Sequence, residues 1–150
     1  MTDDERLLAL AVEQARRGRE EGGIPIGAVL AANGRVLAAG RNRRVQLGSA
    51  IRHGETDAIE NAGRLPAAVY QRATLVTTLS PCFMCTGTAL LYGIPRVVIG
   101  ENETFRGPED LLRRHGVEVV NLDSAECKAM MAEFIAAEPA LWYEDIGVDA

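Results

Sequence analysis

The feature that most constrains this chain is a pair of short motifs, one built on a histidine and the other on two cysteines. His53, Gly54 and Glu55 stand at the predicted start of one helix, and Cys82 and Cys85 stand at the start of another. Residues at positions i and i+3 share one helix face, so both sulfurs can reach a single ion. If His53 is the third ligand, the fold must bring these two helix starts together.

The number and type of these ligands indicate a catalytic zinc site. One imidazole nitrogen and two thiolates leave the fourth tetrahedral position of zinc free for water, whereas a structural site is closed by four protein ligands. Mixed nitrogen and thiolate ligation also favours zinc over harder metals. Ser80 can act as N-cap and Pro81 suits the first helical position, which would place both thiols in the first turn, where the helix dipole favours thiolate.

Glu55 is the predicted proton carrier of this site. Two thiolates and a neutral imidazole neutralise Zn²⁺, so the ion should be a weaker Lewis acid than at a three-histidine site and needs a base beside it. Glu55 can take a proton from the activated water, give it to a ring nitrogen of the substrate, and later protonate the leaving amine. Residues i and i+2 point apart in an ideal helix, so His53 and Glu55 require a distorted first turn, which Gly54 makes easier.

Hydrophobic periodicity along the chain predicts alternating helices and strands. An amphipathic helix over about residues 3–19 precedes a hairpin centred on Asn33-Gly34. The remaining predicted elements are a helix at about 53–63, a strand at 73–78, a helix starting near Cys82, a strand at 96–100, a helix at 109–115, a strand at 117–122 and a helix at 124–137. This alternation indicates an α/β layered domain.

Composition narrows the possible partners and compartment. A chain of 150 residues with 47% hydrophobic residues fits one globular domain. The net charge of −5 argues against nucleic acid as a partner, because non-specific binding needs clustered Lys and Arg. Three cysteines and an acidic start without a signal peptide favour a reducing cytoplasm. No apolar run reaches the roughly 18 residues of a membrane span, so no membrane association is expected.

The sequence resembles the cytidine deaminase superfamily, and within it the fungal-type cytosine deaminases. The motif H-x-E followed by P-C-x-x-C is the signature of zinc nucleobase deaminases, and the stretches EGGIPIGAVL, GSAIRHGE, TTLSPC, YGIPRVVIGEN and WYEDIG extend the similarity over nearly the whole chain. The resemblance implies a three-layer α/β/α fold with a central mixed sheet, one catalytic zinc ion per subunit and a homodimer. It also implies hydrolytic deamination of a free base, cytosine, to uracil and ammonia.

The same resemblance assigns the metal site and the contacts to the base. It makes His53, Cys82 and Cys85 the zinc ligands and Glu55 the proton shuttle. The matching substrate contacts are the Asn42 side chain, the Gly54 backbone amide, the Ser80 backbone carbonyl and the Asp145 carboxylate, which would accept a ring N–H. A small planar ring needs apolar walls around such fixed polar groups, and a buried carboxylate rejects analogues without the ring N–H.

Two aromatic residues match the lid over the pocket of these enzymes, Phe105 and Trp142. The resemblance thus implies a single zinc-dependent deaminase domain over residues 1–150, with a C-terminal lid segment at about 138–150. Two other residues of note are not assigned to the site. Cys127 is predicted to be an inert core thiol, and His115, which precedes Gly116, is predicted to end a helix.

Two departures from the fungal pattern leave the substrate open. Phe83 stands between the cysteines where an acidic residue is expected, and Asp57 adds a carboxylate near His53. If either faces the pocket, the preferred base could instead be isocytosine, guanine, creatinine or an aminotriazine. Two further alternatives are a tRNA adenosine deaminase, which shares the motif but should show a basic face, and a non-catalytic zinc-stabilised binding protein, which Glu55 beside an open metal position disfavours.

Overall fold

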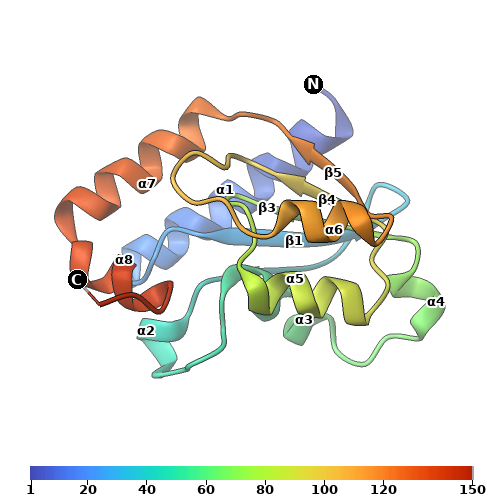
Figure 1. Ribbon diagram of the computed structural model, residues 1–150, viewed down its shortest axis with the longest axis horizontal. Helices are drawn as coiled ribbons and strands as arrows, with labels where there is room; N and C mark the ends of the chain where they lie inside the picture. The colour runs from blue at the N-terminus through green and yellow to red at the C-terminus, as the bar shows by residue number, and fades with distance from the viewer. Residues whose placement is uncertain (150) are drawn as a thin grey trace.

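The chain folds into three layers in a computed structural model that describes residues 1–149 (Figure 1). The five strands are β1 (Gly27–Ala32), β2 (Arg35–Arg41), β3 (Ala73–Thr77), β4 (Arg96–Ile99) and β5 (Glu118–Asn121). The helices are α1 (Asp3–Glu20), α2 (Arg44–Leu47), α3 (Gly54–Ala62), α4 (Ala67–Tyr70), α5 (Phe83–Leu91), α6 (Glu109–Arg114), α7 (Ala125–Ala137) and α8 (Pro139–Asp145).

The strands form one mixed sheet in the order β2-β1-β3-β4-β5. β1 runs antiparallel to both of its neighbours, whereas β3, β4 and β5 run parallel to one another. Because parallel strands need crossover connections, α5 links β3 to β4 and α6 links β4 to β5. The predicted three-layer fold with a central mixed sheet is confirmed.

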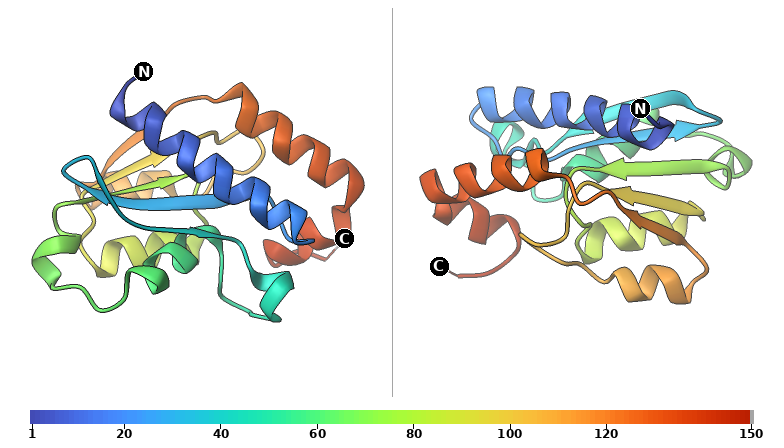
Figure 2. Two further views of the ribbon diagram at one scale, coloured as in Figure 1. Left: turned by 180° about the vertical axis from the view of Figure 1, so that it is seen from behind. Right: turned by 90° about the horizontal axis from the view of Figure 1, so that it is seen from above.

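Each face of the sheet is covered by its own set of helices (Figure 2). On one face, α1 and α7 pack against alternate strand residues through a cluster that includes Leu8, Val12, Val29, Val98 and Cys127. On the other face, α3, α5 and α6 contact the strand residues whose side chains point to that face, among them Leu30, Leu75 and Ile99. The near-continuous apolar strands follow from this burial on both faces.

The turn between β1 and β2 is the predicted two-residue hairpin. Asn33 and Gly34 both have positive φ, at 53° and 74°, which is the backbone of a type I′ turn and explains why this dipeptide occurs there. The other predicted strands and long helices are also present, within a few residues of their expected bounds. The structure adds two four-residue helices, α2 and α4, that the periodicity did not indicate.

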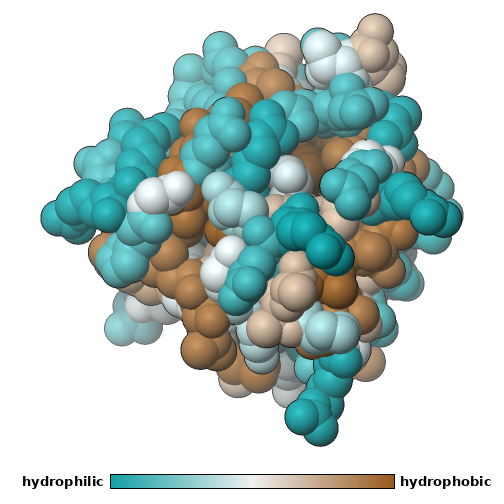
Figure 3. Space-filling view, turned by 90° about the vertical axis from the view of Figure 1, so that its right-hand side faces the viewer, coloured by the Kyte–Doolittle hydropathy of each residue, from teal (hydrophilic) through white to brown (hydrophobic). Residues whose placement is uncertain are grey.

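A third hydrophobic cluster lies beyond the end of the sheet and supports the C-terminal segment. It consists of Ile24, Ile26, Leu79, Met131, Phe134 and Trp142. Through Trp142, this cluster fixes α8 against the end of β1 and α7, near α2 (Figure 1). The opposite end of the molecule, which carries α4 and the β1–β2 turn, shows a mixture of hydrophilic and hydrophobic side chains (Figure 3). Among residues 1–149, every helix is too short or too polar to span a bilayer.

Candidate active site and metal centre

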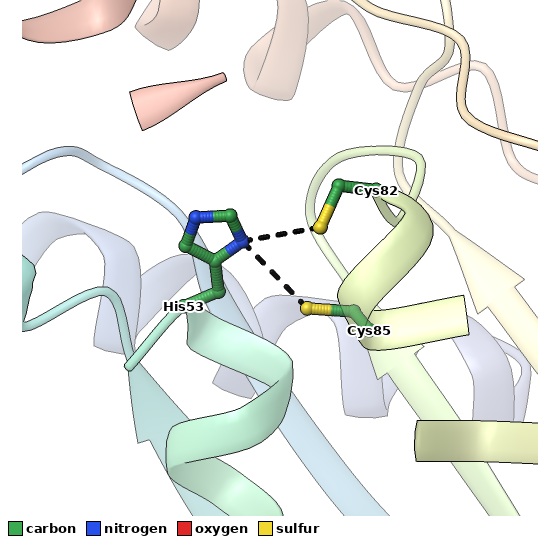
Figure 4. Close-up of side chains that lie close together, drawn as sticks. All are labelled: His53, Cys82 and Cys85. Carbon is green, nitrogen blue, oxygen red and sulfur yellow. Dashed lines mark hydrogen bonds between the residues drawn. The ribbon is translucent and has the colours of Figure 1, made fainter. Parts of the chain in front are cut away.

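The structure brings the histidine and the two cysteines together, as the motif spacing predicted (Figure 4). The Nδ1 atom of His53 lies 3.3 Å from Cys82 Sγ and 3.7 Å from Cys85 Sγ. His53 comes from the N-terminus of α3 and the cysteines from the N-terminus of α5. Two helix starts on the same face of the sheet therefore supply all three donor atoms.

The helix that carries the cysteines begins later than predicted. Its N-cap is Cys82, in extended backbone, and its first residue is Phe83. The prediction that Ser80 caps this helix, with Pro81 as its first residue, is therefore wrong: Ser80 instead donates its hydroxyl hydrogen to Glu109 Oε2 at 2.6 Å. Both thiols still lie in or next to the first turn, where the N-terminal end of the helix dipole favours thiolate.

The separation of the donor atoms fits a zinc ion. Tetrahedral zinc with bonds of 2.0–2.3 Å holds neighbouring nitrogen and sulfur ligands about 3.5 Å apart. The two measured nitrogen–sulfur distances, 3.3 and 3.7 Å, lie on either side of that value. His53, Cys82 and Cys85 could therefore hold zinc with only small movements, and three protein ligands leave one position open.

Glu55 lies beside the three donors in the same pocket, buried with 4% of its surface exposed. His53 is the N-cap of α3, with extended backbone at φ −68° and ψ 169°, and Glu55 is in the first helical turn. The change of backbone between them lets residues i and i+2 converge, as the sequence required. Gly54 has an ordinary φ. Glycine is favoured at this helix start because a Cβ would lie 3.1 Å from the Ile26 carbonyl oxygen, which is a tight contact.

The charges of the pocket residues are strongly coupled. Burial raises the pKa of Glu55 to about 7, although the charge of His53 opposes the shift. A hydrogen bond from Cys85 lowers the pKa of Cys82 to about 4, and the same bond together with burial raises that of Cys85. Burial lowers the pKa of His53, but hydrogen bonds to Asp145 and Cys82 outweigh it and raise the pKa to about 10. At neutral pH the pocket thus holds a thiolate at Cys82 and an imidazolium at His53, and His53 would lose its proton on binding a metal ion. Glu55 is the group whose pKa lies near neutral.

Asp145, the last residue of α8, reaches the metal site from the opposite end of the sequence. Its Oδ1 lies 3.5 Å from His53 Nε2, and its carboxylate accepts hydrogen bonds from Asn42 Nδ2 at 3.0 and 3.2 Å. Burial raises the pKa of Asp145, but the contacts with His53, Asn42 and Arg44 outweigh it and keep the pKa below its usual value. Because Asp145 occupies Nε2, the imidazole presents Nδ1 to the sulfurs, an arrangement common in metal-binding histidines.

Two aromatic residues line the pocket over the donors. The rings of Phe105 and Trp142 meet edge to face, with centroids 6.3 Å apart. Phe105 comes from the loop between β4 and α6, and Trp142 from α8. Ile26, Leu79 and Ile146 complete the apolar walls, so the pocket combines apolar sides with a few polar groups, as sites for small planar ligands do.

The remaining predicted contact residues lie around the pocket in different ways. Ser80 lines it directly. Asn42 is fully buried behind Asp145, and the lining residues do not include it or Gly54. Asn42 is therefore linked to the pocket only indirectly, because it donates a hydrogen bond to Asp145, which lines the pocket.

The two residues that left the substrate open lie outside the pocket. Phe83 is 77% exposed on the outer surface of α5. Asp57 faces away from the donors and accepts hydrogen bonds from the Arg41 amide and from the side chains of Arg43 and Arg52, at 2.8 to 3.0 Å. Neither residue alters the donors and acceptors offered to a ligand, so neither is a reason to prefer another base over cytosine.

Cys127 and His115 are placed as predicted. Cys127 is fully buried between α7 and the sheet, and burial raises its pKa, which makes it an unreactive core thiol. His115 is the C-cap of α6, and its ring contacts the Leu111 carbonyl at 3.0 Å. Neither residue contributes to the candidate metal site.

Several residues help to shape the site in ways that were not predicted from the sequence. Asp57 with its arginines holds the segment on either side of Asn42, and Glu109 holds Ser80. Arg44 contacts both Glu144 and Asp145. These residues act through contacts between segments that are distant in the sequence. The position of a single charged residue in the sequence does not indicate which distant residue it pairs with.

Comparisons with known proteins agree with this geometry. Residues 1–101 match the family model described as the cytidine and deoxycytidylate deaminase zinc-binding region. The cytosine deaminase of Candida albicans is 54% identical over 146 residues, which cover 97% of each chain. The tRNA-specific adenosine deaminase of Bacillus subtilis is 34% identical over 144 residues, which cover 89% of each chain.

Solved structures support the fold. The guanine deaminase of Nitrosomonas europaea superimposes with a TM-score of 0.73 at 24% identity, over 87% of this chain and 83% of that one. The layered sheet, the zinc-type donor set and the family match all indicate a zinc-dependent deaminase. The chain belongs to the cytidine and deoxycytidylate deaminase family of zinc-binding hydrolases.

Proposed function

We propose that this enzyme hydrolyses cytosine to uracil and ammonia. The relative with 54% identity over nearly the full length is named for that activity. The pocket suits a free base, because Phe105, Trp142 and Ile146 leave apolar walls close to the candidate metal site. In the reaction, water adds to the ring carbon that bears the amine, and the carbon–nitrogen bond to that amine then breaks.

His53, Cys82 and Cys85 are the residues that would hold the zinc ion. When bound, zinc supplies the Lewis acidity that makes water a nucleophile near neutral pH. Asp145 would keep His53 in the tautomer that offers Nδ1, since its carboxylate faces Nε2. The N-terminus of α5 favours the deprotonated form of the cysteines.

Glu55 would carry the protons of the reaction. It accepts the proton of the attacking water, delivers it to the ring nitrogen beside the reacting carbon, and protonates the departing amine. Burial raises its pKa, which favours the protonated form that Glu55 needs to act as the acid.

Four groups would bind the base. Asp145 would accept the ring N–H, and the Ser80 carbonyl would accept the amine hydrogens. The Gly54 amide and the Asn42 side chain lie behind the pocket walls and would donate to the ring carbonyl once a base has entered. Asn42 donates to Asp145, so the two groups are held as one unit. Phe105 and Trp142 would cover the ring faces.

The observation that carries this proposal is the position of Asp145 on α8. A buried carboxylate with 2% of its side chain exposed sits 3.5 Å from His53 Nε2 and closes the pocket that contains Glu55. Such an acceptor favours a free base with an N–H and leaves little space for a ribose. The test is ammonia release from cytosine and cytidine by zinc-loaded protein: the proposal requires turnover of cytosine and would be abandoned if only cytidine reacted.

A tRNA substrate fits the structure less well. Helix α8 and its aromatic residue Trp142 cover the pocket, whereas a nucleotide within RNA needs an open rim and a basic face. The net charge of −5 also opposes binding to phosphates. A mobility-shift titration with tRNA separates the two functions, because the proposal requires no shift at micromolar protein.

We propose that the protein is a homodimer that associates through the surface of α5 and the segment before α3. Phe83, Leu91 and Ile51 are large apolar side chains with 77%, 75% and 62% of their surface exposed. Ile51 lines one groove with Thr88 of α5, and large exposed apolar side chains on neighbouring segments are typical of interaction surfaces. Light scattering should give the dimer mass for the parent protein and the monomer mass for Leu91→Glu; a monomeric parent would contradict the dimer.

Residues 138–149 are the described part of the proposed lid, and Ala150 lies outside the described residues. We treat the chain as one deaminase domain, because the three hydrophobic clusters share the same central sheet or its end. A cytoplasmic location is supported by the free thiols of Cys82, Cys85 and Cys127, which a reducing compartment preserves. Cell fractionation with an antibody would test that location.

A further inference from the structure

Arg44 joins the short helix α2 to the C-terminal helix α8. Its Nη2 atom donates to Glu144 Oε1 at 2.8 Å, and its Nη1 atom donates to Glu144 Oε2 and to Asp145 Oδ1, the latter at 3.2 Å. A planar guanidinium that meets a carboxylate through two parallel hydrogen bonds fixes direction as well as distance. The two helices, which lie near each other in Figure 1, are therefore held in a defined arrangement.

The arginine is itself fixed from the side opposite α8. Its Nε atom donates to the Ala50 carbonyl at 3.0 Å, and its backbone amide donates to Asn42 Oδ1 at 3.1 Å. All three nitrogen atoms of the guanidinium are thus engaged, and only 14% of the side chain is exposed. The Arg44 side chain is therefore held in one position, and it can fix the position of α8.

The pocket beneath α8 is narrow in this arrangement. The volume open to the centre of a water-sized sphere is about 20 Å³, roughly what one water molecule needs and far less than a six-membered ring needs. Trp142, Asp145 and Ile146 form one side of it, and all three belong to α8 or its C-cap. A base therefore needs the walls of the pocket to move apart. Because α8 supplies one of these walls, the contacts that hold α8 affect how readily a base is admitted.

We propose that Arg44 is a positioning residue that latches α8 over the metal site through Glu144 and Asp145. It contacts no residue among the predicted zinc ligands and does not line the pocket. The Glu144 half of the latch is 61% exposed, so this ion pair is weak enough to open and close repeatedly. The kinetic consequence rests on the proposed deamination of cytosine, but the latch itself does not.

The lid carries its own probe, because Trp142 is the single tryptophan of the chain. It is 5% exposed when α8 is closed, so quenching of its fluorescence by acrylamide measures opening. Arg44→Gln should raise the quenching constant by at least about twofold, and Glu144→Gln by less, because Arg44 would keep its bond to Asp145. The quenching constant of Arg44→Lys should lie between those of the parent and Arg44→Gln, since lysine keeps the charge but cannot form two parallel hydrogen bonds to one carboxylate.

Two matched controls separate the latch from a general loss of charge. Arg72 and Glu133 are exposed and form no ion pair within residues 1–149. Arg72→Gln and Glu133→Gln should leave quenching unchanged. Thermal unfolding of all variants verifies that they are folded, and Glu144→Gln, which alters an exposed side chain, keeps the test informative if Arg44→Gln does not fold.

Kinetics with cytosine provide the second readout. Arg44 touches no reacting atom, so Arg44→Gln should raise KM at least about fivefold while kcat changes less than about twofold. Unchanged quenching in folded Arg44→Gln, or an equal rise in the controls, would overturn the latch whatever the kinetics show. A parent protein without activity on cytosine would refute the proposed function instead, and quenching alone would then decide the latch.

Discussion

The Nε2 atom of His53 lies 3.5 Å from Oδ1 of Asp145, so the first predicted metal ligand contacts the last residue of the C-terminal helix. The chain thereby joins its metal site to its lid. Nδ1 of the same imidazole faces Cys82 and Cys85. A single ring is thus oriented by the lid on one side and offers its free nitrogen to the metal on the other.

Replacement of Glu55 by glutamine tests the proton carrier. Glu55→Gln keeps the size of the side chain but cannot accept a proton, so cytosine turnover should fall by at least about a thousandfold, within the range for loss of a general acid and base. Zinc content, measured by atomic absorption, should stay at one ion per chain. Full activity in the variant would remove Glu55 from the mechanism.

Loss of a cysteine ligand should release the metal. Cys82→Ser replaces the thiolate donor with a poor zinc ligand, so zinc affinity should fall by at least about tenfold and activity with it. Cys127→Ser, at the buried thiol outside the site, is the matched control and should retain zinc. A chelator should likewise abolish activity of the parent, and added Zn²⁺ should restore it; equal zinc binding in all three proteins would exclude Cys82 as a ligand.

Asp145 should govern recognition of the ring. Asp145→Asn can donate as well as accept, so the N–H of cytosine loses a charged acceptor and kcat/KM should fall by about a hundredfold or more. Zinc content should change little, because the amide oxygen of the variant can still accept a hydrogen bond from His53 Nε2 and keep its tautomer. Unchanged kcat/KM with retained zinc would show that the base binds without this carboxylate.

Asp57 should contribute to stability in a pH-dependent way. Its side chain is 1% exposed and paired with Arg43 and Arg52; burial raises its pKa, but these pairs outweigh it and leave the pKa below the unfolded value of 3.8. The ionised form is therefore favoured in the folded state, so its stabilisation is present above pH 3.8 and disappears as the pH falls through the lower folded pKa.

Urea unfolding of Asp57→Asn measures this contribution. The variant should lose about 2 kcal/mol at pH 7, less than for a fully buried pair because the arginines are partly exposed. The difference from the parent should shrink as the pH falls below 4. Glu60→Gln, an exposed carboxylate on the same helix, is the control and should change stability little. A difference that stays constant with pH would show that the charge of Asp57 is not the cause.

The fold and the metal site could be predicted from different kinds of sequence signal. Long amphipathic segments and the Asn33-Gly34 turn indicated the layered sheet, because period and turn chemistry are local properties. The ligands followed from the spacing of His53, Cys82 and Cys85. The start of α5 was misplaced, since a serine before a proline resembles a cap whether or not its hydroxyl is already bonded to a distant residue such as Glu109.

What sequence reasoning missed depends on contacts between distant segments. Helices α2 and α4 contain four residues each, which is too short for any periodicity. The directions of Phe83 and Asp57 depend on helix rotation relative to the pocket, and the sequence does not specify that rotation at the first turn. The pairing of Arg44 with Glu144, 100 positions apart, likewise appears only once α8 has packed beside the pocket.

The most direct test of the account is a comparison of ammonia release from cytosine, isocytosine, guanine, creatinine, cytidine and adenosine by protein of known zinc content, with Glu55→Gln as the blank. We expect cytosine to have the highest kcat/KM of the set, uracil to be its product, and the variant to release no ammonia. A higher kcat/KM for any other compound, or ammonia release by Glu55→Gln equal to that of the parent, would contradict it.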